Sequence, residues 1–381
     1  MGEEQTVQTE AEVAQSTRIS DIYAAAKRLE GIVRKTPLIY SEFFSDISGN
    51  ATYLKLENLQ TTGAFKLRGA YNRISMLTEE EKARGVITAS AGNHAQGVAY
   101  ASQKLGVNAV ICMPATTPIL KVEATRALGA TVILHGNGFD DAYAHSLTLQ
   151  KEKGYVYIHP FNDRDVLVGQ GTIALEVIDA LKDVDAILVP IGGGGLASGV
   201  ALGAKLVNPQ VKVIGVEPEN AACMKAALSC GRTITLPSAD TVADGCAVRT
   251  AGSLTLEFCR RYLDEIITVS EMEIMSALLS LIEKHKLIAE GAGVLSLAAL
   301  NKLRPHQRRQ HRHLHDFRTH LEGTHLARQS VPLLRPAAGQ AGAASHRRTD
   351  PHRARRERHP PRSRSDDGNR QLPKGTAHRH R

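Results

Sequence analysis

The stretch that decides the fold is residues 186–199, which read AILVPIGGGGLASG. Ala186–Pro190 is a continuous aliphatic run, typical of a strand buried on both faces, and Leu196–Val207 has the length of a helix. The four glycines between them, Gly192–Gly195, would present backbone N–H groups at the positive end of a helix dipole, which suits a phosphate. The stretch lacks the Lys-Ser/Thr pair of a P-loop, and Glu217 matches the ribose-binding acid of a dinucleotide site only loosely.

The same alternation of strand and helix extends to both sides of this stretch. Short aliphatic runs predict further strands at Thr52–Leu56, Val86–Ser90, Ala109–Met113, Thr131–Leu134, Tyr155–Ile158, Val211–Val216 and Ile266–Val269. Segments of helical length predict helices at Asn93–Leu105, Pro118–Leu128, Asp140–Lys153, Gly169–Leu181 and Glu271–Lys284. Repeated strand–helix–strand spacing is typical of parallel sheets with helices on both faces, so the predicted class is α/β.

Length and composition exclude several kinds of protein. A chain of 381 residues is longer than one compact core usually holds, so two domains are expected. No apolar run reaches the roughly 18 residues of a membrane span, and the acidic residues 1–17 contain no secretory signal, so we expect a cytoplasmic protein without a membrane partner. Five cysteines without a C-x-x-C pair indicate neither a disulfide framework nor a zinc ribbon.

The net charge of +8 is unevenly distributed along the chain. Residues 303–381 hold 19 basic and 6 acidic residues, which leaves 28 basic and 33 acidic residues in the remainder. This Arg/His/Pro-rich tail has no Ile or Tyr and only one Val, so it cannot bury enough apolar surface and is predicted to be disordered. Its abrupt change of composition is what a shifted reading frame in a high-GC gene would produce; sequencing codons 295–310 tests that hypothesis.

A lysine stands at the start of a predicted helix in the segment Glu57–Ala70, ENLQTTGAFKLRGA. The polar, glycine-containing turn follows a strand, and the helix begins near Phe65. The positive end of the helix dipole and partial burial both disfavour the ammonium form of Lys66, which makes its amine nucleophilic. On residue type alone a solvated surface lysine is the commoner case, so the prediction depends on the neighbouring motifs.

A second turn between strand and helix reads SAGNHAQG over Ser90–Gly97. Small residues let backbone N–H groups approach a ligand, and the helix N-terminus favours an anion such as a carboxylate. Asn93 could cap the helix or bind a ligand, and His94 taken alone is more often structural than catalytic. Together, an activated lysine, a carboxylate site and a phosphate cradle without magnesium ligands indicate pyridoxal 5'-phosphate (PLP), which needs a lysine and a phosphate nest.

With these motifs in the same order, residues 18–300 closely resemble the serine/threonine dehydratases, fold type II PLP enzymes of the tryptophan synthase β-like class. The segments KVEATRALGA, HPFNDRDVLVGQGT and AEGAG match as well, and the chain is most similar to the catabolic type of threonine dehydratase. The resemblance implies two parallel-sheet α/β domains with the cofactor between them. The large PLP-binding domain would comprise residues 18–50 and 155–302, and the small domain residues 51–154, with 1–17 as a flexible lead.

The resemblance also implies roles for individual residues. Lys66 would form a Schiff base with PLP and, once displaced by the substrate amine, remove the α-proton, with the cofactor phosphate protonating the departing hydroxyl. The other cofactor-binding residues would be Phe65, Asn93, Gly192, Gly193, Gly194, Gly195, Leu196, Gly245 and Glu290, and the substrate carboxylate would be held by Ser90, Asn93 and His94. The implied reaction converts L-threonine to 2-oxobutanoate and ammonia, with L-serine to pyruvate as a side activity, in isoleucine biosynthesis or threonine catabolism.

Two positions depart from related patterns. Serine racemases of this fold usually carry a serine two residues before the equivalent of Asn93, where this chain has Ala91, so elimination is favoured over racemisation. The family also ends its catalytic domain with an apolar strand and a Ser/Cys-Gly-Gly-Asn segment, whose hydroxyl or thiol meets the pyridine nitrogen. Residues 303–381 contain no such segment, so an inactive variant is one alternative.

Further expectations concern the type of reaction, bound ions and partners. Another fold type II enzyme, such as a serine racemase, cysteine synthase or threonine synthase, is the runner-up. No metal is predicted, because Cys223 stands where an acid would have to accompany Glu217 as a ligand. A homo-oligomer, either a dimer or a tetramer, is expected from the resemblance. The arginines of the tail predict incidental rather than specific binding to nucleic acid.

Overall fold

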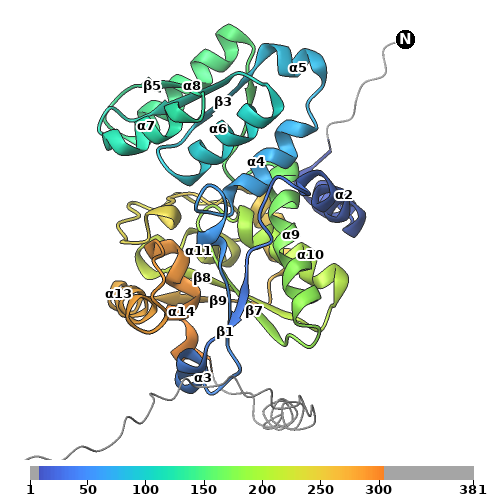
Figure 1. Cartoon of the computed structure of the whole chain (residues 1–381), viewed down its shortest axis with the longest axis vertical. Coiled ribbons are helices and arrows are strands. Elements are labelled where there is room, and N and C mark those ends of the chain that lie inside the picture. Colours follow the sequence, from blue (N-terminus) through green and yellow to red (C-terminus); the bar gives the residue numbers. More distant parts are fainter. Residues whose placement is uncertain (1–7, 304–381) are drawn as a thin grey trace, which may run out of the picture. The chain divides into compact units, whose positions relative to one another are not determined.

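The computed structural model describes residues 8–303, and Figure 1 shows their arrangement. Two parallel sheets, one of four strands and one of three, carry most of the helices, and this arrangement confirms the predicted α/β class. Residues 1–7 and 304–381 lie outside the described part, and so does the tail that the sequence predicts to be disordered. Among residues 8–303, no helix is both long and apolar enough to cross a bilayer.

The four-stranded sheet has the order β5-β4-β3-β6, and all of its strands are parallel. The strands are β3 (Val86–Ala89), β4 (Ala109–Met113), β5 (Thr131–Leu134) and β6 (Val156–Tyr157); the helices that accompany them are α6 (Asn93–Leu105), α7 (Ile119–Ala127) and α8 (Phe139–Lys153). Successive side chains of a strand point to opposite faces. Ile111 therefore packs toward α4 and α6, while Val110 and Cys112 belong to the cluster that includes Ala142 of α8.

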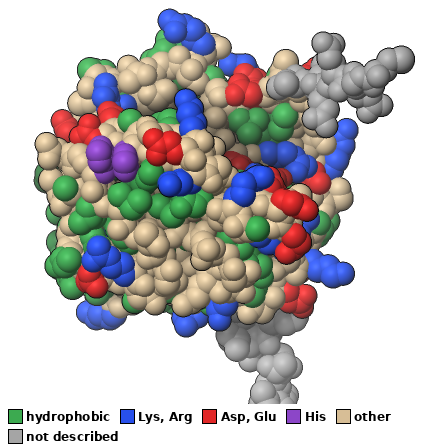
Figure 2. All heavy atoms as spheres, turned by 90° about the horizontal axis from the view of Figure 1, so that it is seen from above, with side chains coloured by type: hydrophobic (Ala, Val, Ile, Leu, Met, Phe, Trp, Pro, Cys, Tyr) green, Lys and Arg blue, Asp and Glu red, His purple; other side chains and the backbone are tan. Residues whose placement is uncertain are grey.

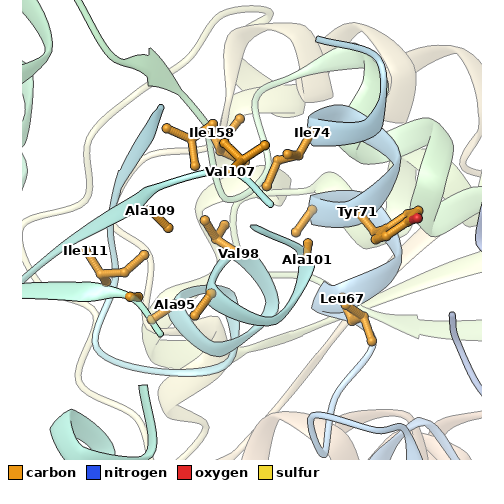
Figure 3. Packing of buried hydrophobic residues seen from close by; sticks show 14 of the residues in the cluster. Leu67, Tyr71, Ile74, Ala95, Val98, Ala101, Val107, Ala109, Ile111 and Ile158 are labelled. Atoms are coloured by element: carbon orange, nitrogen blue, oxygen red, sulfur yellow. The ribbon is translucent and has the colours of Figure 1, made fainter. Parts of the chain in front are cut away.

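Figure 3 shows the first of these two faces from close by, where α4 (Lys66–Ser75) lies against α6. Leu67, Tyr71 and Ile74 recur at helical spacing on α4 and belong to the same buried cluster as Ala95 and Val98 of α6. Leu67 and Ile74 are fully buried, as are the two residues of α6. This packing fixes the first turn of α4, and therefore Lys66, against the first turns of α6.

The three-stranded parallel sheet consists of β7 (Ala186–Pro190), β8 (Lys212–Pro218) and β9 (Glu265–Val269) in the order β7-β8-β9. Val213 packs into a cluster with α10 (Gly195–Val207), whereas Ile214 and Val216 face the cluster that contains α13 (Glu271–Ser280) and α14 (Leu295–Ala298). The remaining helices are α1 (Glu10–Ser16), α2 (Ile19–Leu29), α3 (Glu42–Ser48), α5 (Glu79–Arg84), α9 (Arg164–Ala180), α11 (Cys223–Cys230) and α12 (Ser253–Tyr262). Short 3-10 turns occur at Glu57–Leu59, Glu219–Ala221, Asp244–Cys246, Gly291–Val294 and Leu300–Lys302.

Several elements differ from the sequence-based expectation. The predicted strand at residues 52–56 becomes β2 (Tyr53–Lys55), which pairs antiparallel with the unpredicted β1 (Leu38–Tyr40) outside both parallel sheets. Helix α9 begins five residues early, because the side chain of Asp163 accepts the N–H groups of Asp165 and Val166. The helix predicted to Lys284 continues after α13 as a π-helical turn, Leu281–His285. The domain boundaries at residues 51 and 154 stay a prediction.

Helices α4 and α9 approach each other at two glycines. A Cβ atom on Gly169 would lie 2.7 Å from both the carbonyl oxygen of Arg68 and the Cα of Gly69, too close for any side chain. The N–H of Gly69 donates to Oε1 of Gln170 at 3.2 Å. This contact sets the position of α4, whose first residue is Lys66.

Candidate active site

Lys66 lies at the first residue of α4, where the glycine-containing turn predicted from the sequence ends. Its Nζ donates a hydrogen bond to the carbonyl oxygen of Pro160 at 2.8 Å and lies 5.4 Å from the centre of the Phe65 ring. Burial lowers the pKa of the amine from 10.5 to about 8, although interaction with Cys246 acts in the opposite direction. Roughly a fifth of the amine is therefore neutral near physiological pH, far more than for an ordinary lysine, and the neutral form is the nucleophile.

Two histidines close to Lys66 are also held in their neutral form. Burial, together with the charge of Lys66, lowers the pKa of His94 to about 3 and that of His159 to about 4. The Nδ1 of His159 accepts the N–H groups of Phe161 and Asn162 at 3.2 and 2.8 Å, so its proton is on Nε2. Neither of these two rings therefore competes with Lys66 as an imidazolium at neutral pH.

The glycine loop, Gly192–Gly195, occupies the predicted position between β7 and α10. A Cβ on Gly193 would lie 2.4 Å from the ring of Phe161, and one on Gly194, whose φ is +99°, would lie 2.5 Å from Cε of Met224. Only glycine fits these positions, so the loop can offer backbone groups alone. The N–H groups of the first turn of α10, including Leu196, have no intrahelical acceptor and are available to an anion.

The segment His159–Asn162 links Lys66 to the glycine loop. The carbonyl of Pro160 accepts the amine of Lys66, and the next residue, Phe161, packs with its ring against Gly193 and with its backbone near Gly195. The rings of His159 and Phe161 lie 4.6 Å apart in an edge-to-face arrangement. One short segment therefore contacts both the nucleophile and the candidate phosphate cradle.

A second series of contacts joins the glycine loop to Asn93. A Cβ on Gly192 would lie 3.1 Å from the carbonyl oxygen of Gly245, and one on Gly245 would lie 4.0 Å from Oε2 of Glu290. The same Glu290 oxygen accepts Nδ2 of Asn93 at 2.7 Å. Asn93 is the first residue of α6, and one turn later a Cβ on Gly97 would meet the backbone of Lys66 at 3.1 Å. The contacts therefore form a closed circuit that returns to Lys66.

Ser90 and His94 flank Asn93, and their side chains already have partners in the protein. The Oγ of Ser90 accepts the N–H of Gly92 at 3.3 Å, and Nε2 of the buried His94 lies 2.9 Å from the carbonyl oxygen of Ile158. In that arrangement Nε2 carries the proton and Nδ1, which is buried without a partner, can only accept. His94 can therefore assist a substrate carboxylate through its backbone N–H, not through its neutral ring.

Comparison with known proteins decides the family. Residues 29–313 match the family model described as "Pyridoxal-phosphate dependent enzyme". The chain belongs to this family. It is 52% identical to the L-threonine ammonia-lyase of Thermotoga maritima over 286 residues, which cover 75% of this chain and 71% of that protein. It is 45% identical to the catabolic L-threonine dehydratase of Escherichia coli over 282 residues, covering 74% and 86% of the two chains.

Solved structures similar to this pyridoxal-phosphate dependent enzyme include a threonine deaminase and a serine racemase. The processed form of threonine deaminase isoform 2 from Solanum lycopersicum aligns with a TM-score of 0.73 at 42% identity, covering 77% of this chain and 85% of that one. Maize serine racemase aligns with a TM-score of 0.73 at 37% identity, covering 75% and 87%. These likenesses confirm the fold type II class and the dehydratase-family resemblance.

The residues present fit the cofactor of this family. A phosphate needs converging N–H donors, and the glycine loop provides backbone groups where no side chain can stand. An aldehyde needs an uncharged amine, and burial lowers the pKa of Lys66 to about 8. The resemblance places the Ser/Cys-Gly-Gly-Asn segment, which would meet the pyridine nitrogen, after Leu303. That part of the chain lies outside the described residues.

Several neighbours of the site could not be identified from the sequence. Pro160 and Phe161 belong to the segment HPFNDRDVLVGQGT, which is similar to the family but carries no motif that assigns roles to them. Thr255 bonds to the glycine loop from about 60 residues away and has no local signature. Arg68 is fully buried between Glu57 and Glu176, although arginine is rarely buried unless it is paired.

Proposed function

We propose that this chain is a PLP-dependent lyase that deaminates L-threonine to 2-oxobutanoate and ammonia, and L-serine to pyruvate more slowly. The observation that carries the proposal is the circuit of contacts that joins the amine of Lys66 to the glycine loop and to Asn93. The substrate follows from the relatives named L-threonine ammonia-lyase and L-threonine dehydratase. Ala91 supports elimination rather than racemisation, because it has no proton to deliver from the opposite face of the substrate.

When bound, PLP supplies an electron sink that stabilises negative charge at the substrate α-carbon. The protein would hold its phosphate at the N–H groups of Gly193–Leu196, where the dipole of α10 favours an anion. Ser90, in the turn before α6, and Asn93, the first residue of α6, would hold the substrate carboxylate in the same way. Because contacts join both anion sites to Lys66, its amine would be the basic group next to a substrate held there.

The neutral amine of Lys66 is the group that can take the α-proton. In the overall reaction the α-C–H bond and the bond from the β-carbon to its hydroxyl oxygen break, and water leaves. The released enamine hydrolyses in solution to the 2-oxoacid and ammonia. No redox partner is needed, because the elimination and the hydrolysis leave the overall oxidation state balanced.

The test measures 2-oxobutanoate and ammonia after L-threonine is added to the purified full chain in the presence of PLP. We expect both products from the native chain and from Lys104→Ala, which removes an exposed lysine of α6. Lys66→Ala should form neither product, because it lacks the amine that would hold the cofactor and remove the α-proton. A folded native chain that binds PLP but releases no oxoacid would overturn the proposal, and conversion of L-serine to D-serine would favour a racemase.

We also propose that the enzyme works in the cytoplasm as a homo-oligomer. The cytoplasmic location is the one expected in the sequence analysis, and the oligomer is expected from the resemblance to the dehydratases. Sedimentation velocity over a range of protein concentrations checks the second point. A single species at the mass of one chain at all concentrations would contradict it.

A further inference from the structure

The orientation of the glycine loop depends on what holds its carbonyl groups. In a planar trans peptide, the C=O of one residue and the N–H of the next point in opposite directions. A carbonyl fixed on the outer side of the loop therefore turns the following N–H inward. For a cradle made only of backbone donors, these carbonyl partners decide whether the donors converge on an anion.

Each carbonyl of Gly192–Gly194 has a partner. The C=O of Gly194 accepts the N–H of Ser198 at 2.8 Å, which is the first hydrogen bond of α10. The C=O of Gly192 accepts the thiol of Cys223 at 3.6 Å. The C=O of Gly193 accepts the hydroxyl of Thr255 at 2.6 Å and the N–H of Gly252 at 3.2 Å. The bond from Thr255 is the shortest of these and the only one made by a hydroxyl.

Thr255 is itself held rigidly. It is fully buried in the first turn of α12, and its N–H lies 3.4 Å from Oδ1 of Asn162, which also accepts the N–H of Leu254 at 2.9 Å. Its carbonyl accepts the hydroxyl of Ser198 at 3.2 Å. The Oγ1 of Thr255 would lie 2.7 Å from a Cβ on Gly194, so the hydroxyl also limits that position to glycine.

We propose that Thr255 is a positioning residue for the phosphate group: its hydroxyl fixes the carbonyl of Gly193 and so directs the N–H of Gly194 into the cradle. This inference rests on the proposed PLP chemistry and deepens it. Thr255 does not touch the reacting atoms. Substitution of Thr255 should therefore weaken the binding of a ligand that carries the phosphate group and leave the binding of a ligand without phosphate nearly unchanged.

The test compares binding of PLP with binding of pyridoxal, which has the same aldehyde and ring but no phosphate. The cofactor-free full chain is titrated with each compound, and binding is followed by the visible absorbance of the lysine adduct. We expect Thr255→Val to weaken PLP binding by about tenfold, since one hydrogen bond to a buried carbonyl is lost, and to change pyridoxal binding by less than about twofold.

Two further variants separate positioning from general loss of structure. Thr255→Ser keeps the hydroxyl and should restore the native ratio of the two affinities. Thr125→Val is the matched control, because Thr125 is equally buried and its hydroxyl bonds a backbone carbonyl, that of Lys121 at 2.9 Å, in α7. This control should leave both affinities unchanged.

The outcomes distinguish the two proposals. If the native chain binds PLP tightly and Thr255→Val keeps the native affinity for both PLP and pyridoxal, the role of Thr255 is wrong while the proposed function stands. Equal losses for both ligands would also overturn it, because they indicate a merely structural effect. If the native chain captures neither compound at Lys66, the proposed function fails together with this inference.

Discussion

At the scale of single residues, Lys66 has surroundings that disfavour its charge. Burial lowers the pKa of its amine from 10.5 to about 8. Only the neutral amine attacks an aldehyde, so covalent capture of PLP by the cofactor-free chain should become faster as the pH rises through about 8 and then level off. Stopped-flow absorbance between pH 6 and about 10 measures this dependence.

The reference for this prediction is an unperturbed amine. Capture of PLP by free Nα-acetyl-lysine should keep accelerating toward the ordinary lysine pKa of about 10.4. A midpoint for the protein near that value would show that the amine is hydrated in solution and would contradict the buried position of Lys66.

Some residues of the site could be predicted from the sequence and others could not. Lys66 and Asn93 were found because each begins a helix after a small-residue turn, which is a local pattern. Arg68 was not found, because its burial depends on Glu57 and Glu176, the second of which is 108 residues away. Its guanidinium donates to both carboxylates, and only the folded chain brings these three charges together.

At the scale of elements, the contact between α4 and α9 depends on Gly69 and Gly169. We expect Gly169→Ala to lower the free energy of unfolding by about 1–3 kcal/mol, because the added methyl would lie 2.7 Å from the backbone of α4 and must push the helix away. The same displacement moves Lys66, so activity should fall as well. Chemical denaturation followed by circular dichroism measures the change in stability.

The control for this substitution is Gly138→Ala. Gly138 precedes α8, has a negative φ, and a Cβ there would meet no atom within 4 Å. Its effect on unfolding should stay within about 0.5 kcal/mol. Similar losses for both variants would mean that the approach of α4 to α9 is not what makes glycine necessary at position 169.

Elements were predictable where the deciding interactions are local. Strands β4, β5 and β7 and helix α6 have the bounds expected from the sequence, because continuous apolar runs and a following glycine such as Gly106 delimit them. Strand β1 was missed because it is three residues long and its stability comes from pairing with β2. The parallel order β5-β4-β3-β6 likewise depends on contacts between distant segments, which periodicity does not reveal.

At the scale of the whole molecule, charge separates the tail from the rest. Residues 303–381 have a net charge of +13, and the remainder a net charge of −5. On the face shown in Figure 2, basic and acidic side chains are interspersed rather than gathered into one field. The arginines of the tail are therefore the part of the chain expected to attract polyanions.

We predict that the full chain binds duplex DNA of arbitrary sequence with an affinity that falls steeply as salt rises, whereas a chain ending at Leu303 does not bind. Fluorescence anisotropy over a salt series measures both. Competition with unrelated DNA sequences should show no preference. If the shortened chain bound DNA with the same affinity and the same salt dependence as the full chain, the binding surface would lie within residues 1–303. That result would contradict the prediction.

The meeting of Gly69 with Gly169 has an evolutionary consequence. It brings together the two ends of residues 70–168, the segment that carries the whole four-stranded sheet. Segments whose ends lie close together are those that a host chain accepts as insertions. Because both ends lie inside buried helices, a different β/α segment could be exchanged by recombination only if it rebuilt α4 and α9 with their glycine contact, while the three-stranded sheet and its glycine loop kept their place. Lineages could then vary one half of such an enzyme independently of the other.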